Sequence, residues 1–478
     1  MQAKFQTLLV ANRGEIAVRI IRAAKELGLR TVAVFSDADA DSLAVRIADQ
    51  AVRIGPAHAS KSYLSIPALL DAARESGAGA VHPGYGFLSE NADFAEAVEQ
   101  AGLVFVGPTP HAIRTMGDKA AARSAAMRAG VPTVPGSADV VLTVDDAVAQ
   151  AKDIGFPIMI KASAGGGGRG IRVAQNADEL RQQFALATAE AAAAFGNGAV
   201  YLERFIRRAR HIEVQILGDG ERVVHCFERE CSLQRRRQKV WEEAPSAAID
   251  ETTRAALCES ALRLARAVSY RGAGTLEYLY DDDSKEIFFI EMNTRIQVEH
   301  PITEMVTGVD LVQEMIRIAM GEPLRLQQQD IRLSGAAIEV RINAEDAAKN
   351  FMPSPGKVTQ LLVPGGPGVR FDSMLYPGYT VPAYYDSLLG KLIVHAPDRA
   401  SALCRMQRAL GELVVEGVRT TVPLHQALCA APEVAAAQFH TGFLEVWLAE
   451  NPLAPSVTAT ASTQAPAAPT IPKQGVTA

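Results

Sequence analysis

One ten-residue segment constrains the fold of this 478-residue chain more than any other. It reads Glu291-Met-Asn-Thr-Arg-Ile-Gln-Val-Glu-His300. Side chains alternate between the two faces of a strand, so an extended segment would carry polar groups on one face, namely Glu291, Asn293, Arg295, Gln297 and Glu299. A strand that only fills a core is apolar, because burying unpaired charge is costly. We therefore interpret this face as part of a functional site, with a solvated outer face as the alternative for the segment taken alone.

The residues just upstream favour the functional interpretation. Gly274–Tyr280 and Glu286–Ile290 are predicted strands joined by a turn over Asp281–Lys285. If Tyr280 pairs with Phe288, Glu277 lies directly opposite Glu291, and like charges that face each other across strands are destabilising. Together with Asn293, the two carboxylates predict a hard-oxygen site for Mg²⁺ or Mn²⁺ shared with substrate phosphates. A one-residue slip in the pairing would remove this site.

A glycine-rich segment supplies a candidate phosphate-binding loop. The predicted strand Phe156–Lys161 ends in a lysine and is followed by a run of glycines, Gly165, Gly166, Gly167 and Gly168. Glycine lets backbone N–H groups approach anionic oxygens closely. The spacing differs from G-x-x-x-x-G-K-[ST], which excludes a P-loop of that kind. We interpret the segment as a mobile lid over nucleotide phosphates, and a plain hinge is the alternative.

Composition excludes several classes of function. The net charge is −6 with 48 basic and 54 acidic residues, which does not indicate a nucleic-acid-binding protein. No apolar run approaches the ~18 residues of a membrane-spanning helix, and Asn12-Arg13 cut short any signal-peptide core. The five cysteines are scattered and odd in number, as is typical of reduced thiols in a cytoplasmic protein.

The organisation along the chain predicts an α/β and α+β protein of several units. Thr7–Ala11, Gly14–Gly28 and Thr31–Ser36 predict a strand, a helix and a strand that begin an open α/β sheet. We expect an N-terminal domain over 1–115, a nucleotide-binding unit over 119–330 with a lid over 132–205, and a mainly β C-terminal domain over 335–448. Residues 452–478 are rich in Ala, Pro and Thr and predict a disordered tail.

These features together resemble the biotin carboxylases, whose core is an ATP-grasp domain. The resemblance covers about residues 4–447 and includes, in the family's order, these segments: Ala11–Ala17, His82–Asn91, Met116–Lys119, the Lys161 strand with its glycines, Arg210–Gln215, Glu228–Gln234, Gln238-Lys239, Glu291–Glu299, Glu339–Glu345 and Tyr384–Ser387. Any one of these motifs is weak evidence, whereas the ordered set is specific.

The resemblance implies a role for individual residues. ATP would contact Lys119, Lys161, the four glycines, Glu203, Arg204, Ile206, His211 and Gln234. Metal ions would bind Glu277 and Glu291, with Asn293 nearby. Bicarbonate would contact Lys239, Arg295, Gln297, Val298 and Glu299, with Glu299 as the general base. Arg341 would stabilise the biotin enolate, and Tyr85 would line the biotin pocket.

The resemblance also implies the reaction and its partners. Bicarbonate would attack ATP to give carboxyphosphate, and the resulting CO₂ would carboxylate biotin on a separate biotin carboxyl carrier protein. A carboxyltransferase would then pass the carboxyl group on, most often to acetyl-CoA in fatty acid biosynthesis. A homodimer is implied, with Arg19 at its interface. Asp386 is expected to orient Arg341 or to support that contact.

Several alternatives stay open at this point. Another ATP-grasp ligase would share the lid and the metal carboxylates but would not need the Arg295–Glu299 set or Arg341. A nucleotide sensor would be expected to lack a metal ligand or the base. The acceptor could also be another acyl-CoA, urea or an unusual compound. Arg237 stands where the family commonly has histidine, which puts the local nucleotide contacts in doubt. We interpret His82, His300, Trp241 and Trp447 as structural.

Overall fold

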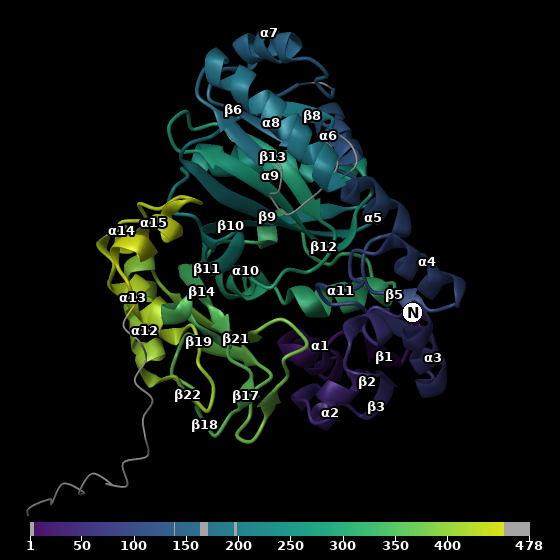
Figure 1. Ribbon diagram of the computed structural model, residues 1–478. Helices are drawn as coiled ribbons and strands as arrows, with labels where there is room; N and C mark the ends of the chain where they lie inside the picture. The colour runs from purple at the N-terminus through teal and green to yellow at the C-terminus, as the bar shows by residue number, and fades with distance from the viewer. Residues whose placement is uncertain (1–3, 138, 163–170, 196–197, 454–478) are drawn as a thin grey trace, which may run out of the picture.

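In the computed structural model, which describes residues 4–137, 139–162, 171–195 and 198–453, the chain begins with alternating strands and helices (Figure 1). The strands β1 (Thr7–Val10), β2 (Arg30–Ser36), β3 (Gln50–Gly55), β4 (Ala80–His82) and β5 (Val104–Phe105) form a parallel sheet in the order β3-β2-β1-β4-β5. The helices are α1 (Gly14–Glu26), α2 (Leu43–Ile47), α3 (Ile66–Ser76) and α4 (Ala92–Gln100). The predicted open α/β sheet is confirmed.

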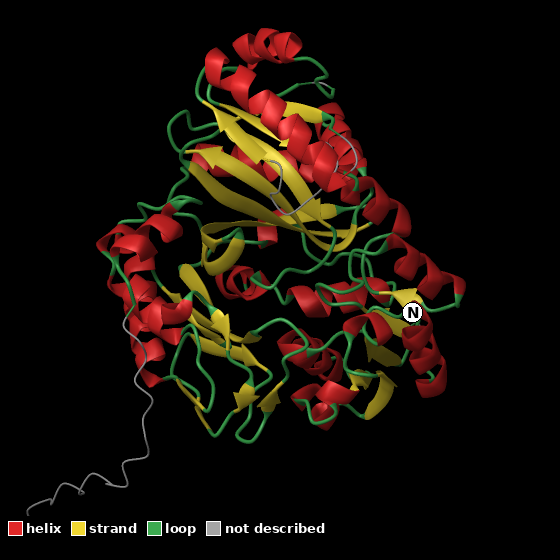
Figure 2. Cartoon of the chain, viewed as in Figure 1, coloured by secondary structure: helices red, strands yellow, loops and turns green. Residues whose placement is uncertain are grey.

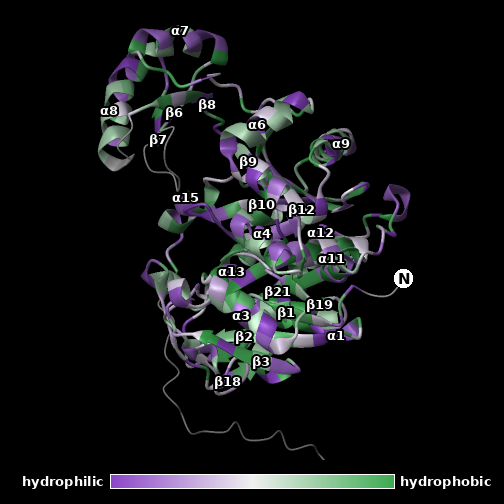
Figure 3. Ribbon diagram, turned by 90° about the vertical axis from the view of Figure 1, so that its right-hand side faces the viewer, coloured by the Kyte–Doolittle hydropathy of each residue, from purple (hydrophilic) through white to green (hydrophobic). Residues whose placement is uncertain are grey.

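The next elements form a small unit that projects from the rest of the molecule (Figure 3). Helices α5 (Pro110–Gly117) and α6 (Lys119–Arg128) lead to it. It contains α7 (Val144–Ile154), α8 (Ala177–Phe195) and the antiparallel sheet β7-β6-β8, made of β6 (Ile158–Ala162), β7 (Ile171–Ala174) and β8 (Val200–Arg204). The glycines Gly165 to Gly168 lie outside the described residues.

An eight-stranded sheet forms the centre of the molecule (Figure 2). Its order is β13-β12-β9-β10-β11-β14-β21-β19, and every neighbouring pair is antiparallel. The strands are β9 (Ala209–Asp219), β10 (Val223–Arg235), β11 (Gln238–Ala244), β12 (Arg271–Asp281), β13 (Ile287–Asn293), β14 (Ala336–Asn343), β19 (Val369–Ser373) and β21 (Leu388–Ala396). The sheet therefore runs without a break from the 119–330 segment into the 335–448 segment.

Helices and short strands surround this sheet. The helices are α9 (Glu251–Ala267), α10 (His300–Thr307), α11 (Leu311–Ala319), α12 (Arg399–Glu412), α13 (Val422–Ala430), α14 (Pro432–Ala435) and α15 (Phe443–Glu450), with short 3₁₀ turns at Asp37–Asp39, Ala59–Lys61, Gln328–Asp330 and Ala347–Lys349. The short strands are β15 (Glu345–Asp346), β16 (Met352–Pro353), β17 (Gly356–Lys357), β18 (Gln360–Leu362), β20 (Thr380–Val381) and β22 (Val414–Glu416).

One apolar cluster ties the N-terminal sheet to the rest of the chain. It contains Ile20 of α1, Leu311 of α11 and Leu389 of β21, all of them fully buried. Burying such side chains contributes about 1.5–3 kcal/mol each. Because of this packing, α1 lies against β21, which is more than 370 positions later in the chain. Glu15 of α1 forms an ion pair there with Lys391 of β21.

Candidate active site

A row of charged side chains crosses four neighbouring strands of the large sheet. Arg229 of β10 pairs with Glu213 of β9, Glu213 with Glu277 of β12, and Glu277 with Glu291 of β13. Directly paired residues share a face, so three carboxylates and one guanidinium lie side by side. Like charges in such positions repel, and this row therefore needs cations around it.

The predicted Glu277–Glu291 pairing is confirmed, although the predicted register beside it is wrong by one. Tyr280 pairs with Ile287 rather than with Phe288, and a β-bulge between Glu277 and Tyr278 restores the alignment. The extra residue of the bulge is Ile290, whose side chain is 41 % exposed. A bulge re-aims the side chains that follow it, and here it returns Glu291 to the face of Glu277.

The expectation of one strand from Glu291 to Glu299 is wrong. Strand β13 ends at Asn293, and α10 begins at His300 with a proline in its first turn. Arg295, Gln297 and Glu299 consequently lie on the intervening loop, where they point to different partners instead of sharing a face. Proline suits the first turn of a helix but not a continuing strand, which explains why a helix begins at this point.

Lys239 gathers three carboxylates at this point. Its Nζ lies 2.5 Å from Glu213, 3.0 Å from Glu277 and 2.7 Å from Glu299. Burial acts to lower the pKa of Lys239, but Glu213, Glu277 and Glu299 raise it well above its ordinary value. Lys239 is thus held as a cation amid carboxylates, and an anion that bound here could share its charge.

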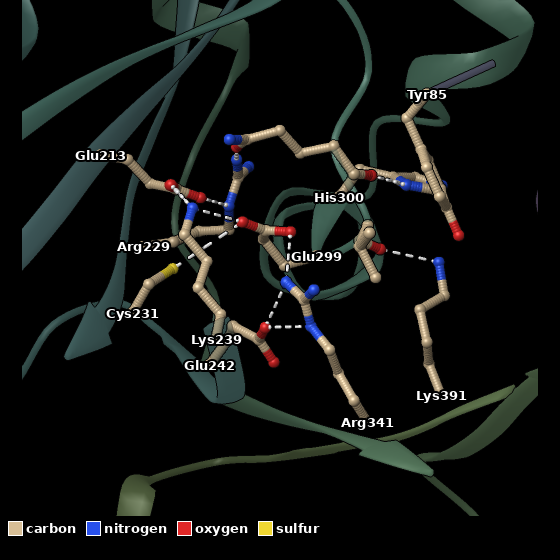
Figure 4. A network of polar contacts seen from close by, with 12 residues as sticks. Tyr85, Glu213, Arg229, Cys231, Lys239, Glu242, Glu299, His300, Arg341 and Lys391 are labelled. Atoms are coloured by element: carbon tan, nitrogen blue, oxygen red, sulfur yellow. Dashed lines mark hydrogen bonds and ion pairs between the residues drawn. The ribbon is translucent and has the colours of Figure 1, made fainter. Parts of the chain in front are cut away.

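Glu299 lies between two cations (Figure 4). Lys239 contacts one of its oxygens, and the Arg341 guanidinium donates to the other at 3.0 Å. Burial acts to raise the pKa of Glu299, but the charges of Lys239, Arg341 and Arg229 lower it well below its usual range. These charges favour an ionised Glu299, as expected, although its cationic contacts are Lys239 and Arg341 and not Arg295.

Arg341 is also held by a second carboxylate. Its Nε donates to Glu242 at 2.6 Å. Burial raises the pKa of Glu242 to about 7, despite the lowering effect of Arg341. Glu242 pairs directly with Glu339 on β14, and burial likewise raises the pKa of Glu339 well above its usual range. Two buried acids whose pKa values are raised by burial therefore lie side by side next to Arg341, and Glu242 is its ion-pair partner.

The other residues expected to bind bicarbonate are tied to separate partners. Arg295 donates to Glu90 at 2.9 Å and to Asn293 at 2.8 Å. The Gln297 amide donates to Glu277 at 2.9 Å and accepts from Arg229 at 2.6 Å. The Val298 carbonyl accepts from the Lys391 ammonium at 2.7 Å. Gln297 thus contacts Glu277 directly, whereas Arg295 and the Val298 carbonyl are held by other partners.

The residues expected to bind ATP lie on the small three-stranded sheet, on the large sheet and at the start of α6. Lys161 of β6 forms an ion pair with Glu203 of β8. His211 Nε2 lies 3.1 Å from Glu277, and its Nδ1 lies 2.9 Å from the Gln234 amide. In addition, Lys119 is exposed at the start of α6, Arg204 lies 3.4 Å from Glu286, and Ile206 is buried.

The surroundings of the Glu291 carboxylate suit a metal ligand. Burial and the charge of Glu277 raise the pKa of Glu291. Within the described part of the chain, no ion pair or hydrogen bond is recorded for its carboxylate, while Glu277 beside it accepts from Lys239, Asn293 and Gln297. A half-buried carboxylate that faces another carboxylate suits a hard divalent cation.

The weaker expectations have mixed outcomes. The Tyr85 hydroxyl donates to Glu15 of α1. Asp386 accepts from the Leu388 backbone N–H at 2.8 Å, and among the described residues it makes no direct contact with Arg341. Its alternative role, support of the subunit contact, stays a prediction. Arg19 lies 2.7 Å from Asp310 and 3.0 Å from Glu304 of its own chain.

Arg237 lies at the tip of the β10–β11 hairpin. Arg236 and Arg237 have φ of 48° and 66°, and Arg235 pairs with Gln238 across the turn. The Arg237 side chain is exposed, and no contact is recorded for it with any described residue. In this structure it is one charge in an exposed basic turn.

The four residues that we interpret as structural are buried or packed in the core. Burial lowers the pKa of His82 to about 3, and it holds the pKa of His300 well below its ordinary value, so both rings are neutral. Trp241 and Trp447 pack in the cluster beneath α12 and α13.

All five cysteines are free thiols. No helix in the described ranges combines the length and the apolar character that crossing a membrane requires.

Five residues of this network were not assigned a role from the sequence: Glu213, Arg229, Glu242, Glu15 and Lys391. One signal was present for Glu213, because polar residues alternate along its strand at His211, Glu213 and Gln215. Arg229 and Glu242 lie on β10 and β11, close in sequence to Glu213 and Lys239. Glu15 and Lys391 are far from the other members in sequence, so only the tertiary packing shows their proximity.

Comparisons with known proteins agree with this geometry. Three family models match successive parts of the chain: "Biotin carboxylase, N-terminal domain" over 4–113, "Carbamoyl-phosphate synthase L chain, ATP binding domain" over 118–327, and "Biotin carboxylase C-terminal domain" over 339–446. The biotin carboxylase of Nostoc sp. is 54 % identical over 443 residues, which is 92 % of this chain and 99 % of that protein. Biotin carboxylase 1 of Bacillus subtilis is 52 % identical over 92 % of this chain and 98 % of its own length.

Solved structures give the same result. The biotin carboxylase domain dimer of the Hydrogenobacter thermophilus 2-oxoglutarate carboxylase, in complex with MgADP, ADP and bicarbonate, superposes with a TM-score of 0.85 at 47 % identity and covers 93 % of this chain and 98 % of its own. A Campylobacter jejuni biotin carboxylase superposes with a TM-score of 0.86 at 46 % identity, covering 92 % and 99 %. The chain therefore belongs to the biotin carboxylase family of ATP-dependent ligases.

Proposed function

We propose that this chain carboxylates biotin held on a separate carrier protein, with Glu299 as the base that activates bicarbonate. The observation that carries the proposal is the position of Glu299 between Lys239 and Arg341, beside the Glu277–Glu291 pair. An acid that must accept a proton has to be ionised beforehand, and the charges around Glu299 keep it so.

In the first step, Lys239, Arg295, Gln297 and the Val298 backbone hold bicarbonate, and Glu299 takes its proton. A bicarbonate oxygen then forms a bond to the γ-phosphorus of ATP, and the bond to the β-phosphate oxygen breaks, which gives carboxyphosphate and ADP. In the structure Lys239 contacts three carboxylates, and bound bicarbonate would share the positive charge of Lys239 with them. The pKa of Glu299 should then rise toward a value useful for a base.

The nucleotide is held by Lys119, Lys161, Gly165 to Gly168, Glu203, Arg204, Ile206, His211 and Gln234. Mg²⁺ or Mn²⁺ held by Glu277, Glu291 and Asn293 would neutralise phosphate charge when bound. These carboxylates belong to the charged row of the sheet, so the chain presents them in a fixed register.

In the second step, carboxyphosphate decomposes to CO₂ and phosphate, and the phosphate takes the N1 proton of biotin. The biotin nitrogen then bonds to the carbon of CO₂. Arg341 stabilises the biotin enolate, and Tyr85 lines the biotin pocket. An electrostatic contribution of this kind is typically worth about 3–4 kcal/mol.

We further propose that the chain acts in the cytoplasm as a homodimer with a biotin carboxyl carrier protein and a carboxyltransferase. The proposal draws on relatives named biotin carboxylase, which this chain matches over 98–99 % of their length. Acetyl-CoA is the proposed final acceptor. A second candidate is a 2-oxo acid, because a 2-oxoglutarate carboxylase domain and the biotin carboxylase subunit of a pyruvate carboxylase are 46–47 % identical to this chain.

Two assays test these proposals. ADP release should require both bicarbonate and free biotin, and release that is independent of bicarbonate would favour a different ATP-grasp ligase. For the acceptor, the chain is combined with its biotinylated carrier and carboxyltransferase, and acetyl-CoA, pyruvate and 2-oxoglutarate are compared. Transfer to acetyl-CoA alone supports the first candidate, and transfer to a 2-oxo acid alone supports the second.

A further inference from the structure

Lys391 is a fully buried cation beside the site that the proposed reaction does not use. It lies on β21 directly opposite Arg341 of β14 and Asp372 of β19. Lys391 and Arg341 therefore rise side by side from one face of the sheet. Burial of a lysine is costly unless it is paired, so its contacts need an explanation.

The contacts of Lys391 connect three parts of the chain. Its ammonium pairs with Glu15 of α1 at 3.1 Å and donates to the Val298 carbonyl at 2.7 Å. Glu15 in turn accepts a hydrogen bond from Tyr85. A continuous series of contacts thus runs from the proposed biotin pocket to the peptide bond that precedes Glu299.

Charge compensation alone would need only the Glu15 contact. The Val298 contact has a different consequence, because the loop between Asn293 and His300 has no strand pairing within the described residues to fix it. The peptide unit is planar, so fixing the Val298 carbonyl also fixes the direction of the Glu299 N–H and the position of the Glu299 Cα, from which its side chain extends. Arg341 holds the Glu299 carboxylate from the next strand.

We infer that Lys391 is a positioning residue: it holds the Val298–Glu299 peptide so that the Glu299 carboxylate faces bicarbonate. The inference rests on the proposed role of Glu299. A reacting group displaced by about 1 Å can lose on the order of 10²-fold in rate. Loss of Lys391 should accordingly affect the bicarbonate step and leave ATP binding unchanged.

The test compares Glu15→Gln with the double variant Glu15→Gln/Lys391→Met. Removing Lys391 alone leaves Glu15 as an unpaired buried charge and can prevent folding, whereas the double variant removes both charges. In the reference variant Glu15→Gln, Lys391 keeps two oxygen acceptors, the Val298 carbonyl and the amide oxygen of the new glutamine. If Lys391 acts on Val298, the double variant should have a kcat/KM for bicarbonate on the order of 10²-fold below that of Glu15→Gln, with a KM for ATP within about two-fold. Equal kcat/KM values for the two variants would overturn the inference.

Hydrogen exchange gives a readout that does not depend on turnover. Amides over 294–299 should exchange faster in the double variant than in Glu15→Gln, and equal rates would contradict the inference. Lys357→Met, an exposed lysine in the same C-terminal segment, is the matched control and should behave as the parent. Failure of the parent itself to couple ADP release to bicarbonate would refute the proposed function instead, so the two failures are distinguishable.

Discussion

Replacing Glu299 by glutamine should abolish turnover while leaving the fold intact. The substitution keeps the size and hydrogen-bonding capacity of the side chain and removes its charge and its ability to take a proton. Loss of a general base typically lowers the rate by ~10²–10⁴-fold. The KM for ATP should change little, because the proposed nucleotide contacts lie on other residues.

The stability effect can be worked out from the neighbours of Glu299. Breaking a buried ion pair typically costs ~3–5 kcal/mol when the remaining charge is left without a partner. Here Lys239 retains Glu213 and Glu277, and Arg341 retains Glu242. Neither cation loses its last carboxylate, so the cost should be nearer the ~1 kcal/mol of an ordinary hydrogen bond.

The assay measures steady-state ADP release with bicarbonate and free biotin, together with thermal unfolding of the same preparation. We expect a fall of at least ~10²-fold in kcat and only a few degrees in Tm. A Glu299→Gln protein that retains more than half of the parent activity would refute the assigned role. A fall in activity accompanied by a collapse in Tm would refute the reasoning about the remaining carboxylates.

Three further predictions concern the surrounding charges. Glu291→Gln should raise the Mg²⁺ concentration for half-maximal activity by roughly ten-fold or more without lowering Tm, because it removes a carboxylate that faces Glu277; an unchanged Mg²⁺ titration contradicts this. Burial raises the folded-state pKa of Glu242 from 4.5 to about 7, so its contribution of up to about 3 kcal/mol is present below pH ~4.5 and is lost as the pH rises to ~7. Glu242→Gln should therefore flatten the pH dependence of unfolding free energy over that range, and an unaltered slope would exclude the buried proton. Arg237→His should leave ATP affinity within about two-fold of the parent between pH 6 and 8, because the exposed Arg237 contacts no described residue; a titration that diverges with pH would place Arg237 against the nucleotide.

Features that depend on residues close together in the chain could be predicted from the sequence. The pairing of Glu277 with Glu291 follows from one hairpin, and the alternation of strands and helices predicts the N-terminal sheet. The prediction of Tyr280 opposite Phe288 failed because a bulge at Ile290 cannot be seen in the strand pattern, and this bulge restored the carboxylate pairing by a different route.

Contacts between residues far apart in the chain could not be predicted from the sequence. A strand was expected to continue to Glu299, but the polar side chains there contact separate partners elsewhere in the chain, and these contacts determine the path of the loop. The cations that hold Glu299 come from β11 and β14, and Lys391 reaches Val298 from β21. Their proximity depends on an eight-stranded order that local patterns do not encode.

The central claim is that bicarbonate itself attacks ATP, and isotope transfer tests it most directly. With ¹⁸O-labelled bicarbonate, ATP and free biotin, one bicarbonate oxygen should appear in each inorganic phosphate, because the bond formed to the γ-phosphorus survives the decomposition of carboxyphosphate. Short reaction times limit exchange of the label with water, and mass spectrometry of the phosphate reads the result. Phosphate that carries one ¹⁸O atom supports the account, and phosphate labelled only from water contradicts it.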